Sequence, residues 1–182
     1  MEKYIALLRG VNVGGKNKID MKALKIVFET LGFDHVKTYI NSGNILFESK
    51  HEDLTILQTL CEDSIKAHFL LDVKVLIISV KTLSDTLNHA PTWWDEQPED
   101  IHYAIFLLPS IHIDEVYQLV GAIKPDLEHI THHDQVIFWS TTRKNFPKTR
   151  WSKIAASKAN AHVTIRNANT VKKLLALANL SD

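Results

Sequence analysis

The sequence predicts an α+β fold made of two ferredoxin-like units packed together, each with the element order β-α-β-β-α-β. Short apolar runs bounded by turn residues alternate with stretches in which apolar residues recur at helical spacing. In each half, two predicted strands are separated by only a few turn residues, which is typical of a hairpin. We expect a first unit at residues 1–80, a connection at 81–100, and a second unit at 101–182 that ends in a helix.

Turn and capping residues set the limits of the elements in the first unit. Asp20 and Asp53 are suitable helix N-caps, and Gly32 follows the last apolar residue of the first helical pattern. Gly43, in the turn NSGN, can adopt the positive φ that a tight hairpin needs. The predicted elements are a strand at 4–8, a helix from Asp20 to Gly32, a hairpin of 36–40 and 45–49, a helix after Asp53, and a strand at 73–79.

The second unit repeats this order without repeating the residues. The stretch 81–100 reads as a short helix followed by an acidic connection that contains Trp93 and Trp94. Apolar residues at helical spacing end near Gly121. The further elements are strands at 101–109, 127–131, 135–140 and 162–166, a helix at 113–120, a short helix from about Ser152, and a last helix from Thr170 to Asn179.

The loop GVNVGGKN, residues 10–17, resembles the phosphate loop of nucleotide hydrolases, which has the pattern G-x-x-x-x-G-K-[ST]. Asn17 stands where that pattern needs a hydroxyl for Mg²⁺. Lys18 and Ile19 separate the loop from the helix cap at Asp20, whereas a phosphate loop leads directly into its helix. Strands that pair as a hairpin are also the wrong scaffold for a parallel nucleotide-binding sheet. We therefore assign no phosphate loop.

The predicted topology brings two glycine-bearing bends together. In a split βαβ unit the first two strands run parallel, so the loop after the first and the hairpin after the second emerge at one end of the sheet. Consecutive backbone amides near glycine can form an anion-binding concavity, and Arg9 and Lys16 add positive charge. Gly, Asn and Ser also suit ordinary turns, which is the competing interpretation. The predicted ligand-binding residues are Arg9, Gly10, Asn12, Gly14, Gly15, Lys16, Asn41, Ser42, Gly43 and Asn44, with Lys153, Arg166 and Asn167 from the second half.

Three segments resemble an uncharacterised bacterial family of about this length: RGVNVGGKNKIDMKAL, GFDHVKTYINSGNILFES and TIRNANTVKKL. The family signatures are an R-G-[IV]-N-V-G-G loop, a T-Y-x-x-S-G-N hairpin and a T-x-R-N-W-x-T-V-x-K-L segment. The resemblance implies a compact α+β protein and no established activity or catalytic residue. Ala168 stands where the family pattern leads us to expect Trp, and the basic loop before Ser152 lacks the expected glycines.

Two alternative functions remain open from the sequence. The segment 141–153 mixes five cations with Phe146 and Trp151, a composition that suits single-stranded nucleic acid. Solvated cations on a loop whose aromatic residues anchor it to the core explain the same composition. The second alternative is an enzyme acting on a phosphate ester or an amide, with Ser42 or a bound water as nucleophile. No base can be assigned to Ser42 from the sequence.

Other chemistry-bearing residues have simpler explanations. His132 and His133 are adjacent in a predicted hairpin turn beside Glu128, His129 and Asp134, and neighbouring strand residues point to opposite faces, so we predict no metal site. Cys61 lies on an apolar helical face, where a free cysteine packs as a small hydrophobe. Arg166 either holds an anionic ligand or pairs with an acid. We expect no cofactor.

Composition and charge set broad limits. The chain has 182 residues, a single cysteine and no apolar run of membrane-spanning length, so we expect a cytoplasmic protein without a membrane partner. The net charge is zero, but residues 1–134 carry a balance of −8 and residues 135–182 a balance of +8. The two halves either attract each other or present a basic face to an anionic partner. The sequence leaves the oligomeric state open.

Overall fold

The structure, a computed structural model, describes residues 1–180 and has the predicted α+β architecture. It contains two four-stranded antiparallel sheets, one in each of two compact units. Unit 1 comprises Met1–Ser84 and the residues from Lys173 on, and unit 2 comprises Asp85–Lys172. Among residues 1–180, no helix combines the length and the apolar character that crossing a bilayer requires.

Unit 1 has the element order β-α-β-β-α-β. Its sheet has the strand order β2-β3-β1-β4. Because β1 and β2 each pair antiparallel with β3, they run parallel to each other, and the ends that follow them lie on the same edge. The elements are β1 (Glu2–Leu8), α1 (Met21–Thr30), β2 (Asp34–Tyr39), β3 (Asn44–Ser49), α2 (Leu54–Phe69) and β4 (Val75–Ser79), followed by α3 (Val80–Asn88).

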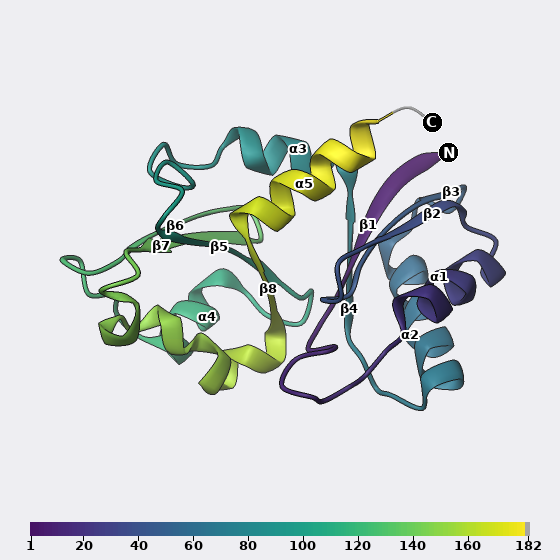
Figure 1. Cartoon of the computed structure of the whole chain (residues 1–182), viewed down its shortest axis with the longest axis horizontal. Coiled ribbons are helices and arrows are strands. Elements are labelled where there is room, and N and C mark those ends of the chain that lie inside the picture. The colour runs from purple at the N-terminus through teal and green to yellow at the C-terminus, as the bar shows by residue number, and fades with distance from the viewer. Residues whose placement is uncertain (181–182) are drawn as a thin grey trace. The chain divides into compact units, whose positions relative to one another are not determined.

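The predicted helix caps of unit 1 are present. The side chain of Asp20 accepts a hydrogen bond from Ala23 N at 2.8 Å, and that of Asp53 accepts from Thr55 N at 2.8 Å. Helices α1 and α2 lie on the same side of the sheet, and their apolar faces close the core between them and the strands (Figure 1). Cys61 of α2 is fully buried in this core, and burial raises the pKa of its thiol to about 12.

Unit 2 repeats the strand order as β6-β7-β5-β8, but 3-10 helices replace its second long helix. Helix α4 and the 3-10 helices pack on one side of the sheet, around the buried Trp139 and Trp151 (Figure 1). The elements are β5 (Ile101–Leu107), α4 (Ile113–Val120), β6 (His129–His133), β7 (Val136–Thr141), η1 (Phe146–Lys148), η2 (Trp151–Ala156), η3 (Lys158–His162), β8 (Val163–Asn167) and α5 (Ala168–Asn179).

Glu128 explains why the first strand of the predicted hairpin at 127–131 begins later, at His129. Its carboxylate is buried and accepts four N–H groups, from the Trp139 indole (2.8 Å) and from the backbone of Lys124, Arg150 and Trp151 at 2.9–3.0 Å. Charge-assisted hydrogen bonds of this kind are stronger than neutral ones. Glu128 thereby anchors the chain between β7 and η2 to the core.

The start of α5 differs from the prediction. The helix begins at Ala168, and Asn167 Oδ1 accepts hydrogen bonds from Thr170 N at 2.9 Å and Thr170 Oγ1 at 2.7 Å. Asn167 is therefore the capping residue, three residues before the predicted helix start at Thr170. An Asn side chain caps a helix well because its oxygen reaches the free amide three residues on.

Candidate functional site

The two glycine-bearing bends of unit 1 lie side by side, as the parallel course of β1 and β2 predicts. Leu8 N donates to Gly43 O at 2.8 Å, and Asn12 Nδ2 donates to Asn41 O at 2.8 Å. A Cβ atom at Gly43 would stand 2.5 Å from Val11 Cγ2 and 2.7 Å from Leu8 Cβ. The bends are in such close contact that only glycine fits at this position.

The loop between β1 and α1 is a miniature hairpin. Lys16 N donates to Val13 O at 3.0 Å across a two-residue turn in which Gly14 and Gly15 have φ of +57° and +76°. Two consecutive positive φ values define the type I′ turn, which glycine adopts without steric cost. The Gly-Gly pair therefore has a local conformational reason. The helix after the loop starts at Met21, so the loop is not built as a phosphate loop.

Some of the backbone amides that were predicted to face an anion already donate hydrogen bonds within the protein. The backbone amides of Arg9, Asn12 and Lys16 donate to the protein's own carbonyls at 2.9–3.1 Å. Within residues 1–180, no hydrogen bond uses the amide of Gly14 or Gly15, and both residues are exposed at the tip of the turn. The tip of the turn therefore has two adjacent amides available as donors.

The asparagines of the two bends hold the backbone rather than project into solvent. Asn12 Nδ2 donates to Ile19 O and Asn41 O, and its Oδ1 accepts from Ile19 N at 2.9 Å. Asn44 is fully buried and donates to Tyr39 O and Ser42 Oγ at 3.0 and 2.9 Å. Ser42, the predicted nucleophile, thus takes part in the internal network of the hairpin.

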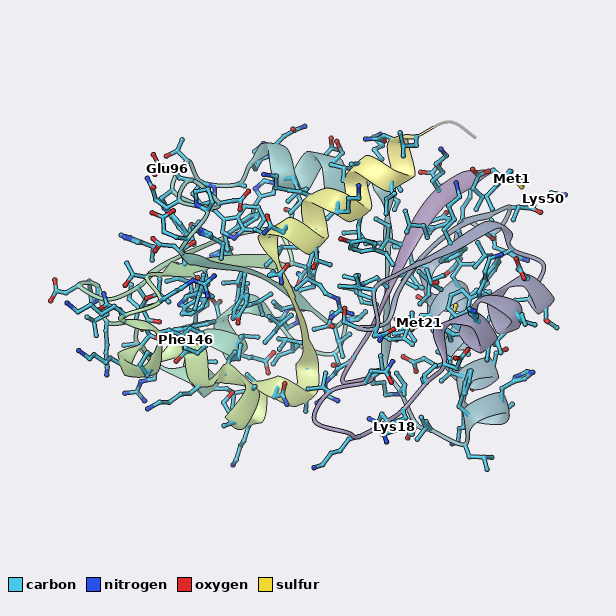
Figure 2. The ribbon with its side chains drawn as sticks, in the orientation of Figure 1. Met1, Lys18, Met21, Lys50, Glu96 and Phe146 are labelled. Carbon is cyan, nitrogen blue, oxygen red and sulfur yellow. The ribbon has the colours of Figure 1, made fainter. Side chains whose placement is uncertain are left out.

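A cavity of about 430 Å³ opens beside the joined bends. Lys18 lines it, although the residues predicted from the sequence do not include Lys18. The signal was present, because Lys18 adds a third cation to a loop that already contains Arg9 and Lys16. Figure 2 shows Lys18 at the outer edge of this loop. The cavity is lined by Asn12, Gly15, Lys18, Ile19, Asp20, Met21 and Asn41.

The same bends also carry exposed apolar side chains that the prediction omits. Val13 and Ile40 are 63% and 50% exposed, and Ile40 holds a φ of +48°. A β-branched residue in the left-handed region is an outlier that costs on the order of 1–3 kcal/mol. The two bends thus combine backbone donors, cations and two exposed apolar side chains.

The candidate residues of the second half belong to unit 2. Lys153 is exposed on η2, whereas Arg166 is buried in β8 and donates through Nη1 to Thr164 Oγ1 and Ile165 O, both at 2.9 Å. Burial lowers the pKa of Arg166 to about 10, so its guanidinium stays charged at neutral pH. Asn167 caps α5. A role for these residues together with the bends of unit 1 stays a prediction.

In the basic segment 141–153, the tryptophan that the nucleic-acid alternative uses for base stacking is not exposed. Trp151 is fully buried, with its indole N–H donating to Gly121 O at 3.1 Å and its ring edge-on to Tyr117. Its predicted stacking on bases is therefore wrong, because the ring is part of the core. The aromatic residues anchor the segment, as the simpler interpretation holds.

The histidines of unit 2 make ring contacts. His133 stacks on His89 with ring centroids 4.1 Å apart, and His132 lies edge-on to Tyr117. In the described part of the chain, no three His, Cys, Asp or Glu residues are grouped so that they could hold a metal ion.

Fold and site together define a two-unit α+β protein in which a β1–α1 loop with the sequence VNVGGK is joined to an NSGN hairpin. The family described as "Protein of unknown function (DUF1697)" matches residues 1–138, and the chain belongs to this family. This confirms the resemblance drawn from the motifs, although the segment TIRNANTVKKL lies beyond the matched residues.

Among solved structures, a conserved bacterial protein from Streptococcus pneumoniae is similar, with a TM-score of 0.85 and 28% sequence identity. The match covers 98% of this chain and 99% of that one, so it extends over both units. None of the curated proteins matches the chain.

Proposed function

We propose that unit 1 binds a small anionic ligand, phosphorylated or carboxylated, at the Gly14–Gly15 turn. The observation that carries the proposal is the exposed pair of glycine amides, neither of which donates a hydrogen bond within residues 1–180. Successive backbone amides in a turn conformation can form an anion-binding concavity, called a nest. The glycines leave space for the ligand, because a Cβ at either position would meet no atom within 4 Å.

The charges around the turn support an anion. Lys16 and Lys18 are exposed on the same short loop, and an ammonium group can reach a phosphate or carboxylate without a fixed geometry. One acid, Asp20, also lines the cavity, but its Oδ1 accepts the hydrogen bond from Ala23 N that caps α1. The loop therefore offers Lys16, Lys18 and the two glycine amides against one carboxylate that already has a structural role.

The joined bends give the turn a fixed support. The side chain of Asn12 connects the loop to Ile19 and Asn41, and Asn17 Nδ2 donates to Gly10 O at 3.0 Å. A pre-ordered loop loses little conformational entropy on binding, which favours affinity for a small ligand. Exposed Val13, which directly precedes the turn, suits a ligand with an apolar part next to its anionic group.

The experiment is a thermal-shift and calorimetric screen of phosphate, pyrophosphate, nucleotides, sugar phosphates, dicarboxylates and short oligonucleotides at constant ionic strength. The test variant is Lys16→Ala combined with Lys18→Ala. The control is Lys50→Ala, an exposed lysine that follows β3 at the opposite end of the same sheet (Figure 2). It changes the net charge of unit 1 in the same direction without touching the turn.

We expect a ligand that stabilises the wild-type protein and the Lys50 variant and binds the double variant at least tenfold more weakly. Stabilisation that is equal in all three proteins would contradict the proposal. Cytoplasmic location stays a prediction that this screen does not address.

A further inference from the structure

A serine and a histidine of unit 2 form a buried pair on neighbouring strands. His102 of β5 and Ser140 of β7 are direct partners in the register of the sheet, and side chains opposite each other in this way lie on the same face. Ser140 Oγ lies 2.6 Å from His102 Nδ1. This is the distance at which a base can take the proton of a serine nucleophile.

The other contacts of His102 fix the protonation of its ring. Nε2 lies 2.8 Å from the carbonyl oxygen of Gln97, which only an N–H can satisfy. Asp95 N donates to Nδ1 at 3.0 Å, which requires a lone pair there. The neutral ring therefore carries its proton on Nε2, and Ser140 donates its hydroxyl proton to Nδ1. The carbonyl of Gln97 orients the ring, as the third member of a catalytic triad does.

Both side chains border a cavity of about 230 Å³ in unit 2. The cavity is also lined by carboxylates and by Trp93, and Figure 2 shows one of the acids, Glu96, on the loop between α3 and β5. A negative lining disfavours an anionic substrate, and an indole face attracts a cation. The acidic residues of the lining are Glu96, Asp100 and Asp126.

The geometry points to a second, catalytic site in unit 2, in which Ser140 and His102 cleave a small neutral or cationic ester. Ser140 Oγ attacks the carbonyl carbon while its proton passes to His102 Nδ1. The ester C–O bond then breaks, the alcohol leaves with that proton, and the acyl group stays on Ser140. Water attacks the acyl carbon, gives one proton to Nδ1, and releases the carboxylic acid as Ser140 Oγ regains a proton.

The hydrogen bond from Asp95 N limits the rate of this site. When Nδ1 takes up the proton of Ser140, the amide of Asp95 can no longer donate to it, and only the Gln97 carbonyl holds the ring. We therefore expect acylation of Ser140 by activated esters and phosphonylation by fluorophosphonates, with loss of fluoride, rather than rapid cleavage of amides. This activity is independent of the anion site in unit 1.

The test uses the full chain with a fluorophosphonate probe and with 4-nitrophenyl acetate. Mass spectrometry of the labelled wild-type protein identifies the modified residue without any variant. The variants are Ser140→Ala and His102→Gln. The matched control is Ser110→Ala, because Ser110 Oγ also faces a histidine nitrogen, His162 Nδ1 at 3.2 Å, but on the exposed surface.

We expect the probe on Ser140, no labelling in Ser140→Ala, and labelling slowed about 100-fold or more in His102→Gln, the range for loss of a general base. Labelling and ester cleavage in Ser110→Ala should equal those of the wild type. An unlabelled wild-type protein, or a probe attached to Ser110 or another residue, would overturn the assignment even if a variant fails to fold.

Discussion

Replacing Gly43 by alanine tests how closely the two bends of unit 1 approach each other. The new Cβ would lie 2.5 Å from Val11 Cγ2 and 2.7 Å from Leu8 Cβ, and both neighbours are buried. Gly32 is the matched control. It has a similar positive φ, +80° against +73°, but a Cβ there would meet no atom within 4 Å.

The expected loss of stability follows from two separate costs. A non-glycine residue in the left-handed region lowers the stability by about 1–2 kcal/mol, and this loss applies to both variants. Overpacking a buried site costs a further 1–3 kcal/mol or so, and only Gly43→Ala incurs it. The free energy of unfolding should therefore fall by about 1–2 kcal/mol in Gly32→Ala and by about 2–5 kcal/mol in Gly43→Ala.

Urea denaturation followed by far-UV circular dichroism measures this difference. Tryptophan fluorescence would miss it, because all four tryptophans belong to unit 2: Trp93, Trp94, Trp139 and Trp151. Unchanged m-values would show that the midpoint shift reports stability. Equal losses in the two variants would refute the close approach of the bends and remove the support of the turn.

Three further perturbations test other parts of the structure. Glu128→Gln places an NH₂ group among four N–H donors and should lower the free energy of unfolding of unit 2 by about 2–4 kcal/mol. Urea denaturation followed by tryptophan fluorescence measures this loss. The control Glu96→Gln, at an exposed position, should change the stability little. Asn12→Ala removes three hydrogen bonds and should lower the free energy of unfolding of unit 1 by about 1–3 kcal/mol. Urea denaturation followed by circular dichroism measures this loss. An unchanged stability would contradict the role of Asn12 in connecting the two bends. Because burial raises the pKa of Cys61, its thiol ionises at lower pH in the unfolded state than in the folded state. The free energy of unfolding should therefore be unaffected below about pH 9 and should be lower by about 1.4 kcal/mol at pH 10. Melting curves from pH 8 to 10 should therefore fall less steeply for Cys61→Ala than for the wild type, and parallel curves would show that this thiol is not the cause.

Local signals in the sequence predicted most of the fold. The caps Asp20 and Asp53 and the glycines near the ends of elements act over three or four residues, so their effects can be derived from the residues alone. The parallel course of β1 and β2 followed from the order of elements, and with it the contact between the bends. The short helix predicted from about Ser152 is present as the 3-10 helix η2, but its anchoring by Glu128 spans more than 20 residues and has no local signal.

Sites that depend on register or burial could not be predicted in this way. Ser140 and His102 become neighbours only through the pairing of β5 with β7, and neither stands in a recognisable motif. Trp151 is a residue type that stacks on bases and lies in a basic segment, and only its burial in the core excludes that role. In the bends, the contact between the two turns could be predicted, but which backbone amides form no hydrogen bond depends on the hairpin bonds of Asn12 and Lys16.

The most direct measurement of the central claim is amide NMR of ¹⁵N-labelled protein during a titration with pyrophosphate. The Gly14 and Gly15 resonances should shift together and saturate with a Kd of about 1 mM or tighter, while Gly32 and Gly121 stay in place. If Gly14 and Gly15 do not move, or if all glycine amides shift alike without saturation, the turn does not bind anions.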